Sequence, residues 1–263
     1  MTVLSVNLNK IALVRNSRSG QTPNVADAAR TVIAAGAGGI TVHPRPDQRH
    51  VRPSDVAALA ALLRQHPGIE FNIEGNPFAG PRDNGYPGFD ALVESARPHQ
   101  ATLVPDGDDQ LTSDHGWDLG GDTSRLCAAI ARYQGWGARV SLFMDPVIEQ
   151  IDRAKACGAD RIELYTGPFA EVVWRHGADH ADSRAALARY RQAASHAAAI
   201  GLGVNAGHDL DLANLPLFSQ IREVAEVSIG HALISDALNL GLATTVQRYL
   251  QAIAGDSNDR QQP

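Results

Sequence analysis

The chain has 263 residues, with 23 lysines and arginines against 29 aspartates and glutamates, which gives a formal net charge of −6. This acidic balance argues against a general nucleic-acid binder, because the phosphate backbone requires a basic face. The apolar fraction of 44% and the charged fraction of 20% are those of an ordinary globular protein. The length is consistent with one or two average domains, and also with a single α/β barrel of about 250 residues.

No segment has the pattern of a targeting or membrane-spanning sequence. Met1–Lys10 alternates apolar and polar residues and lacks a basic region followed by an apolar one. The most apolar segment, Val32–Val42, has 11 residues, mostly alanine and glycine, and is too short to span a bilayer. We therefore expect a soluble cytoplasmic protein that does not associate with membranes.

Two cysteines, Cys127 and Cys157, are too few for a disulfide framework or a cysteine-rich zinc site. Both lie in alanine-rich segments with a helical pattern. We expect them to be small buried apolar residues.

Short strand-like runs alternate with helical patterns along the chain, which is typical of a parallel α/β fold. Strands are predicted at Leu4–Asn9, Gly39–His43, Ile69–Glu74, Ala101–Val104, Arg139–Phe143, Arg161–Tyr165, Leu202–Asn205 and Glu226–Ile229. Helical patterns lie between them, for example at Asp122–Gln134, Val147–Cys157, Ser183–Ile200, Leu212–Ile221 and Leu242–Ile253. No linker divides the chain, so we expect one domain over residues 1–254. The polar tail, 255–263, is predicted to be disordered.

The two faces of the predicted strands differ in polarity. In the third strand Ile69, Phe71 and Ile73 lie on one face, and Glu70, Asn72 and Glu74 lie on the other. A parallel sheet covered on both sides is normally apolar on both faces. The pattern therefore predicts a (β/α)8 TIM barrel, in which the apolar face meets the helices and the polar face lines the interior.

Burying glutamate, asparagine and histidine inside a barrel costs several kcal/mol for each group unless the groups are paired. We interpret the polar lining as a functional pocket at the carboxyl ends of the strands. The alternative is an inert network in which the polar groups satisfy one another.

Three segments after predicted strands have the residue types of an anion site with acid–base chemistry. His43-Pro44-Arg45-Pro46-Asp47-Gln48-Arg49-His50 follows the second strand and carries two histidines and two arginines. Asn205-Ala206-Gly207-His208 and Ser228-Ile229-Gly230-His231 end the seventh and eighth strands, where barrels commonly bind phosphate on backbone N–H groups. A solvated charged loop remains the alternative for the first segment.

A metal site is not expected. His43, His208 and His231 are far apart in sequence, and the arginines Arg18 and Arg45 would oppose a cation. The one histidine pair at helical ligand spacing, His176 and His180, has no obvious third ligand beside it. We expect these two histidines, like His66, His99, His115 and His196, to be surface residues.

Several segments together resemble the pyridoxine 5′-phosphate synthase (PdxJ) family in order and spacing, from residue 4 to about residue 253. They are Val6-Asn7, Ile11-Ala12, Arg15-Asn16, Arg18, Thr41-Val42-His43, Arg45, Asp47, Arg49-His50, Asn72-Ile73-Glu74, Leu103-Val104-Pro105-Asp106, Val140-Ser141-Leu142-Phe143, Ile162-Glu163, Thr166-Gly167, Val204-Asn205-Ala206-Gly207-His208 and Ile229-Gly230-His231-Ala232.

The resemblance implies a single barrel with extra helices, assembled as a homo-oligomer: an octamer built from dimers. It implies an enzyme that condenses two small phosphorylated substrates, 1-deoxy-D-xylulose 5-phosphate and 3-amino-2-oxopropyl phosphate. The products are pyridoxine 5′-phosphate, inorganic phosphate and water. It also implies that no metal or organic cofactor takes part.

The resemblance carries roles to individual residues. His43 resembles a general base, Glu74 a second acid–base group, His208 a proton donor and Glu163 a further carboxylate. Residues that resemble contacts to the xylulose phosphate are Arg45, His50 and Thr112. Those that resemble contacts to the aminoketone phosphate are Asn7, Arg18, Asp209, Gly230 and His231. Arg18 is placed by the resemblance near a dimer interface.

The chain departs from the family pattern at four places. Asn9-Lys10 stands in a substrate-binding position where the family usually has Asp-His, and Asp209 stands where it has glycine. The segment Gly75–Tyr86 contains several additional residues. Glu70 shares a strand face with Glu74 and competes for its role, although Glu74 lies nearer the rim.

Two alternative functions follow from these departures. Lys10 at the predicted strand end is a candidate nucleophile for a Schiff-base aldolase. A diverged barrel that binds a sugar phosphate or vitamin phosphate without turnover is the second alternative, although His43, Glu74, Glu163 and His208 argue against it.

Overall fold

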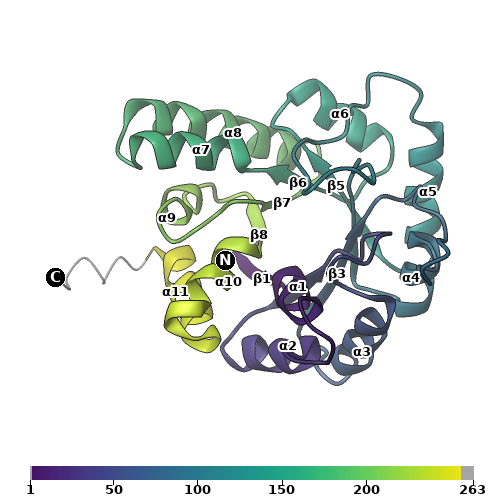
Figure 1. Ribbon diagram of the computed structural model, residues 1–263. Coiled ribbons are helices and arrows are strands. Elements are labelled where there is room, and N and C mark those ends of the chain that lie inside the picture. Colours follow the sequence, from purple (N-terminus) through teal and green to yellow (C-terminus); the bar gives the residue numbers. More distant parts are fainter. Residues whose placement is uncertain (1, 256–263) are drawn as a thin grey trace.

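Eight parallel strands close into a barrel in chain order, so that β1 pairs with both β2 and β8 (Figure 1). The computed structural model describes residues 2–255. The strands are β1 (Val3–Asn7), β2 (Gly39–Val42), β3 (Glu70–Gly75), β4 (Gln100–Leu103), β5 (Arg139–Met144), β6 (Arg161–Tyr165), β7 (Gly203–Gly207) and β8 (Val224–Ile229). The predicted (β/α)8 barrel is confirmed, and all eight predicted strands are present with ends shifted by a few residues.

Helices surround the barrel, and several strands are followed by more than one helix. They are α1 (Asn9–Asn16), α2 (Val25–Ala34), α3 (Pro53–Leu63), α4 (Phe89–Ala96), α5 (Ser124–Gly135), α6 (Ile148–Ala156), α7 (Gly167–His176), α8 (Ala181–Ala199), α9 (Leu215–Phe218), α10 (His231–Leu240) and α11 (Leu242–Ala254). In Figure 1, α7 and α8 lie side by side and extend away from the barrel.

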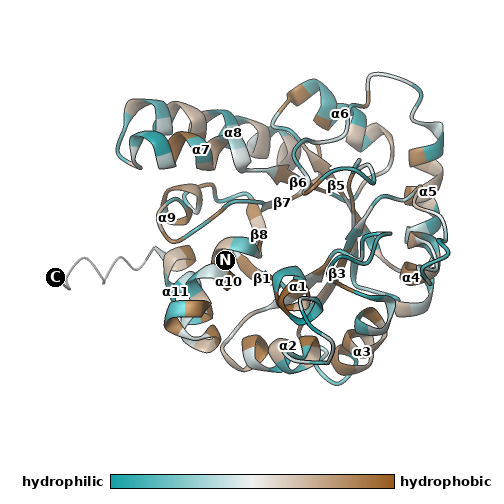
Figure 2. Ribbon diagram, viewed as in Figure 1, coloured by the Kyte–Doolittle hydropathy of each residue, from teal (hydrophilic) through white to brown (hydrophobic). Residues whose placement is uncertain are grey.

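The outer helices bury apolar faces in the core. In α2, for example, Val25, Ala28, Ala29 and Val32 are buried at helical spacing. Figure 2 shows hydrophilic and hydrophobic residues around the same helices, as expected where one side meets the core and the other meets solvent. No helix in the described residues is both long and apolar enough to cross a bilayer.

The barrel interior is polar, and side chains at the amino ends of the strands form a hydrogen-bonded network. Glu70 and Arg139, the first residues of β3 and β5, form a salt bridge of 2.6 Å. Arg161, the first residue of β6, donates to Asn205 Oδ1 at 2.8 Å. Asn205 Nδ2 in turn donates to Glu226 Oε1 at 3.4 Å. The inert-network interpretation therefore holds at the amino ends of the strands, where these polar side chains compensate one another.

The first strand is shorter than predicted. Strand β1 ends at Asn7, and Asn9-Lys10 begins helix α1 instead of extending the strand. The side chain of Asn7 explains the change, because its Oδ1 accepts a hydrogen bond from the backbone N–H of Asn9 at 3.0 Å. Asparagine favours such a turn, which directs the chain out of the sheet.

The expectation for the cysteines is wrong. Cys127 of α5 and Cys157, which follows α6, form a disulfide bond with their Cα atoms 4.9 Å apart. Cys157 is buried as expected and Cys127 is half-buried. The pairing depends on the packing of two neighbouring helices, and a separation of 30 residues in sequence carries no signal of it.

The polar tail predicted to be disordered lies almost wholly outside the described residues. Gly255, its first residue, follows α11 with a φ of 78°, a conformation that glycine adopts readily at the end of a helix. The remainder, 256–263, lies beyond the part of the chain that the structure describes.

Candidate active site

The carboxyl ends of the strands surround two adjoining cavities of about 320 and 170 Å³. Every residue predicted for the site except Arg18 lines one or both of them. The predicted residues that line them are Asn7, Asn9, Lys10, His43, Arg45, His50, Glu74, Thr112, Glu163, His208, Asp209, Gly230 and His231. These residues, from seven of the eight strands or their following loops, thus meet at one end of the barrel, where barrel enzymes carry their chemistry.

Arg18 does not join this group within one chain. It is exposed in the turn after α1 and lines neither cavity. The sequence argument that Arg18 and Arg45 both give the cavity a positive lining is therefore wrong for Arg18 within a single subunit.

Glu74 lies near the end of β3 and is held by Asn7, whose Nδ2 donates to Glu74 Oε2 at 3.2 Å. Burial, together with a smaller contribution from the nearby Asp106 carboxylate, raises the pKa of the Glu74 carboxyl to about 7 against the opposing charges of His208 and Arg45. Glu70, its competitor in sequence, lies at the opposite end of the same strand in its salt bridge with Arg139. Of the two carboxyls, the one that lines the cavities is Glu74.

Glu163 of β6 is a second carboxyl in the larger cavity and is only 3% exposed. Burial and the adjacent Glu74 carboxyl raise the pKa of Glu163 well above its usual range. Its Oε2 atom has no hydrogen-bond partner among the described residues. Gly207 of β7 makes room for this side chain, because a Cβ at that position would contact the Glu163 carboxylate.

Two neutral imidazoles, His43 and His50, line the smaller cavity. Burial lowers the pKa of His43 well below its usual range, and the charge of Arg45 lowers it further. Burial lowers the pKa of His50 to about 3, with smaller contributions from Arg45 and Lys10. The backbone N–H of His43 donates to Asn9 Oδ1 at 2.8 Å. Asn9 therefore fixes the start of the loop that carries both histidines.

His208 follows β7 and is held at both ring nitrogens. Its Nδ1 lies 2.9 Å from Asp209 Oδ2, and its Nε2 lies 2.9 Å from Thr112 Oγ1. The hydrogen bond from His208 is the main reason that the pKa of Asp209 lies below its usual value. His208 and Asp209 both have positive φ angles, 84° and 60°. The Thr166 hydroxyl anchors this strained turn by donating to the carbonyls of Gly207 and His208.

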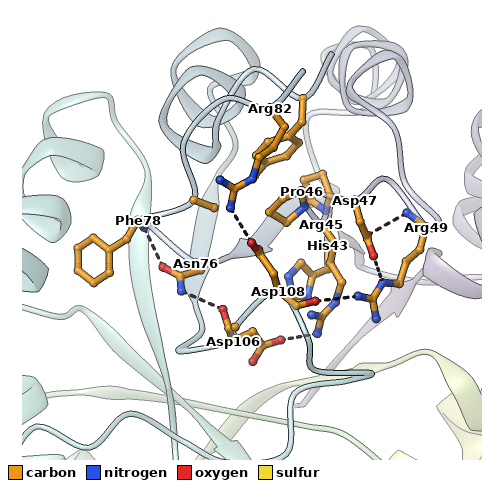
Figure 3. Close-up of a pocket in the computed structure, with 14 residues that line it drawn as sticks. His43, Arg45, Pro46, Asp47, Arg49, Asn76, Phe78, Arg82, Asp106 and Asp108 are labelled. Carbon is orange, nitrogen blue, oxygen red and sulfur yellow. Dashed lines mark hydrogen bonds and ion pairs between the residues drawn. The ribbon is translucent and has the colours of Figure 1, made fainter. Parts of the chain in front are cut away.

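A third cavity of about 220 Å³ lies beside the first two and shares His43 and Arg45 with the smaller one. Figure 3 shows Arg45 against Asp106, and Asn76 Nδ2 donating to the Asp106 carbonyl at 2.9 Å. Arg82 forms a salt bridge with Asp108 at 2.8 Å. The additional segment predicted from the sequence, Gly75–Tyr86, thus forms one wall of this side cavity.

Asp106 and Ser113 are site residues for which the sequence predicted no role. The Ser113 hydroxyl donates to Asp106 Oδ2 at 2.7 Å, and the same oxygen accepts from Arg45. The position of Asp106 directly after a strand, within Leu103-Val104-Pro105-Asp106, is the signal that could have identified it. No pattern marks Ser113, because the long loop that carries it has no periodicity.

Helix N-termini point at the larger cavity from two sides. Gly230 follows β8 and is the N-cap of α10, and Lys10 lies in the first turn of α1. Free backbone N–H groups at a helix N-terminus favour anions, and the Lys10 ammonium adds a positive charge. A Cβ at Gly230 would lie 3.0 Å from Asn7 Cβ, so glycine allows the turn to approach β1. The arrangement can hold phosphate groups above a floor of titratable carboxyls.

The fold recurs in solved structures of low sequence identity. Tryptophan synthase from M. tuberculosis, in its aminoacrylate-bound form, superimposes with a TM-score of 0.59 at 13% identity, covering 96% of this chain and 93% of the other. Phosphoribosylanthranilate isomerase from Thermotoga maritima gives a TM-score of 0.54 at 12% identity over 97% of this chain and 100% of the other. At these identities the likeness concerns the barrel alone.

The sequence itself matches much nearer relatives. Residues 4–255 match the family described as pyridoxal phosphate biosynthesis protein PdxJ. Pyridoxine 5′-phosphate synthase from Xanthomonas campestris pv. campestris (strain B100) is 59% identical over 255 residues, 97% of each chain. The enzyme of the same name from Xylella fastidiosa (strain 9a5c) is 54% identical over 253 residues, covering 96% of this chain and 95% of the relative. The chain therefore belongs to the PdxJ family of pyridoxal phosphate biosynthesis proteins.

Proposed function

We propose that the chain is a pyridoxine 5′-phosphate synthase that condenses 1-deoxy-D-xylulose 5-phosphate with 3-amino-2-oxopropyl phosphate and releases pyridoxine 5′-phosphate, inorganic phosphate and water. The family membership supports the reaction. The observation that carries the assignment to this site is the pair of carboxyls with raised pKa values, Glu74 and Glu163, in one cavity with His208.

The reaction requires repeated proton transfers, because the amine must condense with a ketone, water and phosphate must leave, and an aromatic ring must form. A carboxyl with a pKa of about 7, such as Glu74, is present in both protonation states at neutral pH and can both give and accept a proton. The neutral imidazole of His43 acts as a base, and Glu163, whose raised pKa favours the protonated form, acts as a donor. Groups whose pKa values are pushed apart thus divide the work.

The two substrate phosphates have separate positions in this proposal. Arg45, His50 and Thr112 hold the xylulose phosphate in the smaller cavity. Gly230 and His231 hold the aminoketone phosphate at the N-terminus of α10, together with Asn7. Lys10 lines both cavities and contacts either phosphate. Asp209, predicted from the resemblance as a substrate contact, has its carboxylate on His208, so we assign it the role of orienting that imidazole.

The position of Arg18 is the reason to include a homo-oligomer in the proposal. The assembly is built from dimers and can be as large as an octamer. The exposed Arg18 reaches an aminoketone phosphate only in the cavity of a neighbouring subunit.

A cytoplasmic location is also part of the proposal. The Cys127–Cys157 disulfide stands against it, because such bonds rarely persist in a reducing compartment. Counting free thiols in protein isolated from the cytoplasm under acid quench decides between the two.

The first test is product formation. The purified chain, treated with a chelator, is mixed with both substrates, and pyridoxine 5′-phosphate is followed by mass spectrometry. We expect product above the enzyme-free control, and a loss of at least a hundredfold in Glu74→Gln. Wild-type protein that binds both phosphates without forming product would overturn the proposed reaction and favour the non-catalytic barrel.

Lys10 supplies the observation for a second candidate, a Schiff-base aldolase, since its ammonium lines both substrate cavities. Borohydride reduction in the presence of a keto-sugar phosphate distinguishes the two activities. A covalent adduct on Lys10 supports the aldolase, whereas unlabelled Lys10 in an enzyme that forms pyridoxine 5′-phosphate excludes it.

A further inference from the structure

Three metal-ligating side chains meet at the end of the α7–α8 pair, away from the barrel cavities. His176 is the last residue of α7, His180 is the N-cap of α8, and Asp182 lies in the first turn of α8. One ligand atom from each lies within 4.8 Å of the other two. Among residues 2–255 this is the one group of three or more histidine, cysteine, aspartate or glutamate side chains with such spacing.

The structure supplies the third ligand that the sequence did not show. In sequence His176 and His180 have helical spacing, but the segment between them contains Gly177 and Asp179, which disfavour a helix. In the structure the chain turns between the two helices, so that the rings stack with their centroids 4.9 Å apart and their planes at 21°. Asp182 Oδ2 lies 3.8 Å from His176 Nε2 and 3.6 Å from His180 Nδ1.

The backbone that carries these ligands is held by hydrogen bonds within the turn. The Gly177 N–H donates to the Val173 carbonyl at 2.7 Å, and the fully buried Ser183 donates its hydroxyl to the Gly177 carbonyl at 2.7 Å. The Asp182 N–H donates to His180 Nδ1 at 3.2 Å. The three Cα positions are therefore set without a cation, which reduces the ordering cost of binding one. The hydrogen bond from the Asp182 N–H uses the Nδ1 lone pair of His180, so in the proposal that follows His180 binds a metal through Nε2.

The side chains themselves are accessible and able to adjust. Their exposed fractions are 35% for His176, 48% for His180 and 61% for Asp182. Zinc binds histidine nitrogen and carboxylate oxygen at about 2.0–2.2 Å, so tetrahedral ligands lie roughly 3.5 Å from one another. Rotation of exposed side chains closes the gap from the present spacing, and a hydrated cation reaches them without any opening of the fold.

The local charges oppose one another in part. His176 lies at the carboxyl end of α7, where the helix dipole is negative, whereas His180 and Asp182 lie at the positive amino end of α8. The full negative charge of the Asp182 carboxylate offsets that partial positive charge. The neighbouring arginines are engaged elsewhere: Arg175 pairs with Glu171, and Arg184 donates to the Asp179 carbonyl. Within the described part of the chain, no arginine or lysine pairs with the Asp182 carboxylate.

We propose that His176, His180 and Asp182 bind one divalent transition-metal ion. Two imidazoles and one carboxylate match the ligand preference of zinc, with water completing the tetrahedron. Bound there, the ion links the end of α7 to the start of α8. The site lies outside the substrate cavities, so it stands or falls independently of the proposed reaction.

The test is zinc titration by calorimetry on the full chain without a histidine tag, after chelator treatment and dialysis at pH 7.5. Wild-type protein is expected to bind one zinc ion at this site. His176→Ala and Asp182→Asn are each expected to weaken that affinity at least tenfold, and His176→Ala combined with His180→Asn to abolish it. Asparagine at position 180 keeps a good N-cap, so the start of α8 is preserved.

His196→Ala is the matched control, because His196 is another partly exposed histidine of α8, paired with Asp152 outside the cluster. It is expected to keep wild-type affinity. Zinc is also expected to raise the melting temperature of wild-type and His196→Ala proteins but not of the double variant. A double variant that binds zinc as tightly as wild type would place the ion elsewhere, for example on the barrel histidines, and would overturn the proposal. Wild-type protein that takes up no zinc would also overturn it.

Discussion

Arg45 and Asp106 form a salt bridge whose side chains are only 5% and 3% exposed, at the wall between the smaller cavity and the side cavity (Figure 3). Arg45 comes from the loop after β2, and Asp106 from the loop after β4. The pair therefore joins two loops that are not consecutive in the barrel. It also places a carboxylate close enough to Glu74 to raise the pKa of that acid.

Asp106→Asn is expected to affect both neighbours. The pKa of Glu74 should fall, because a like charge that raises it is removed. The acid limb of the pH profile of kcat/KM should then move to lower pH. Arg45 should lose its ionic partner, with KM for the xylulose phosphate rising about tenfold. Full pH profiles with both substrates measure these effects.

Asp108→Asn is the control for this variant, because Asp108 forms an exposed pair with Arg82 on the rim of the same cavity. Exposed pairs contribute about 0–1 kcal/mol, so we expect nearly wild-type kinetics. An unshifted acid limb in Asp106→Asn, with normal folding, would show that Asp106 does not act on Glu74.

The barrel and most of the site were predictable because both depend on local periodicity. The alternation of Glu70, Asn72 and Glu74 with apolar residues identifies a polar interior, and residues at strand ends meet in any closed barrel. Choosing between Glu70 and Glu74 needed only their order along the strand. Periodicity does not predict the residue at which a strand ends. A local side-chain hydrogen bond can determine that residue, as the bond from the Asn9 N–H to Asn7 Oδ1 does for β1.

Other features depend on packing between distant segments, which leaves no periodic signal. Asp106 acquires its role only when a loop without periodicity folds against Arg45. The Cys127–Cys157 bond requires that the start of α5 lie beside the end of α6. Arg18 shows the limit of transferring residue roles by resemblance, since its position in the sequence does not reveal which subunit's cavity it serves.

Glu74→Gln is expected to stabilise the protein at alkaline pH while abolishing most turnover. A carboxyl with a folded pKa of about 7 and an unfolded pKa near 4.5 favours unfolding increasingly as pH rises between these values. The variant lacks this penalty, so its free energy of unfolding at pH 8 should exceed that of wild type by about 1–3 kcal/mol. At pH 4 the Glu74 carboxyl is largely protonated in both the folded and the unfolded state, so the variant and the wild type should have similar free energies of unfolding. Urea denaturation at both pH values measures the difference, and an equal difference at both would contradict the raised pKa.

Asp209→Gly is expected to lower kcat without disrupting the fold. Glycine adopts the φ of 60° at this position more easily than aspartate, so the fold should be retained. The His208 imidazole loses the carboxylate that orients it, and kcat should fall about tenfold to a hundredfold. Steady-state kinetics of Asp209→Gly and Asp209→Asn distinguish the two effects, because asparagine keeps a side-chain oxygen able to accept from His208. Wild-type kcat in the glycine variant would show that Asp209 has no part in orienting His208.

Cys127→Ser is expected to lower the free energy of unfolding, because loss of the disulfide gives the unfolded chain more conformational freedom. A cross-link between residues 30 apart restricts the unfolded ensemble by about 3–4 kcal/mol in the loop-closure treatment. Urea denaturation of oxidised wild-type protein, reduced wild-type protein and the variant should therefore show a higher midpoint for the oxidised form, with the other two alike. Cys127 and Cys157 line none of the three cavities, so kcat should remain at the wild-type level. If reductant leaves the wild-type midpoint unchanged, the bond contributes nothing to stability, and a lower midpoint in the variant would then reflect the packing of the Cys127 side chain.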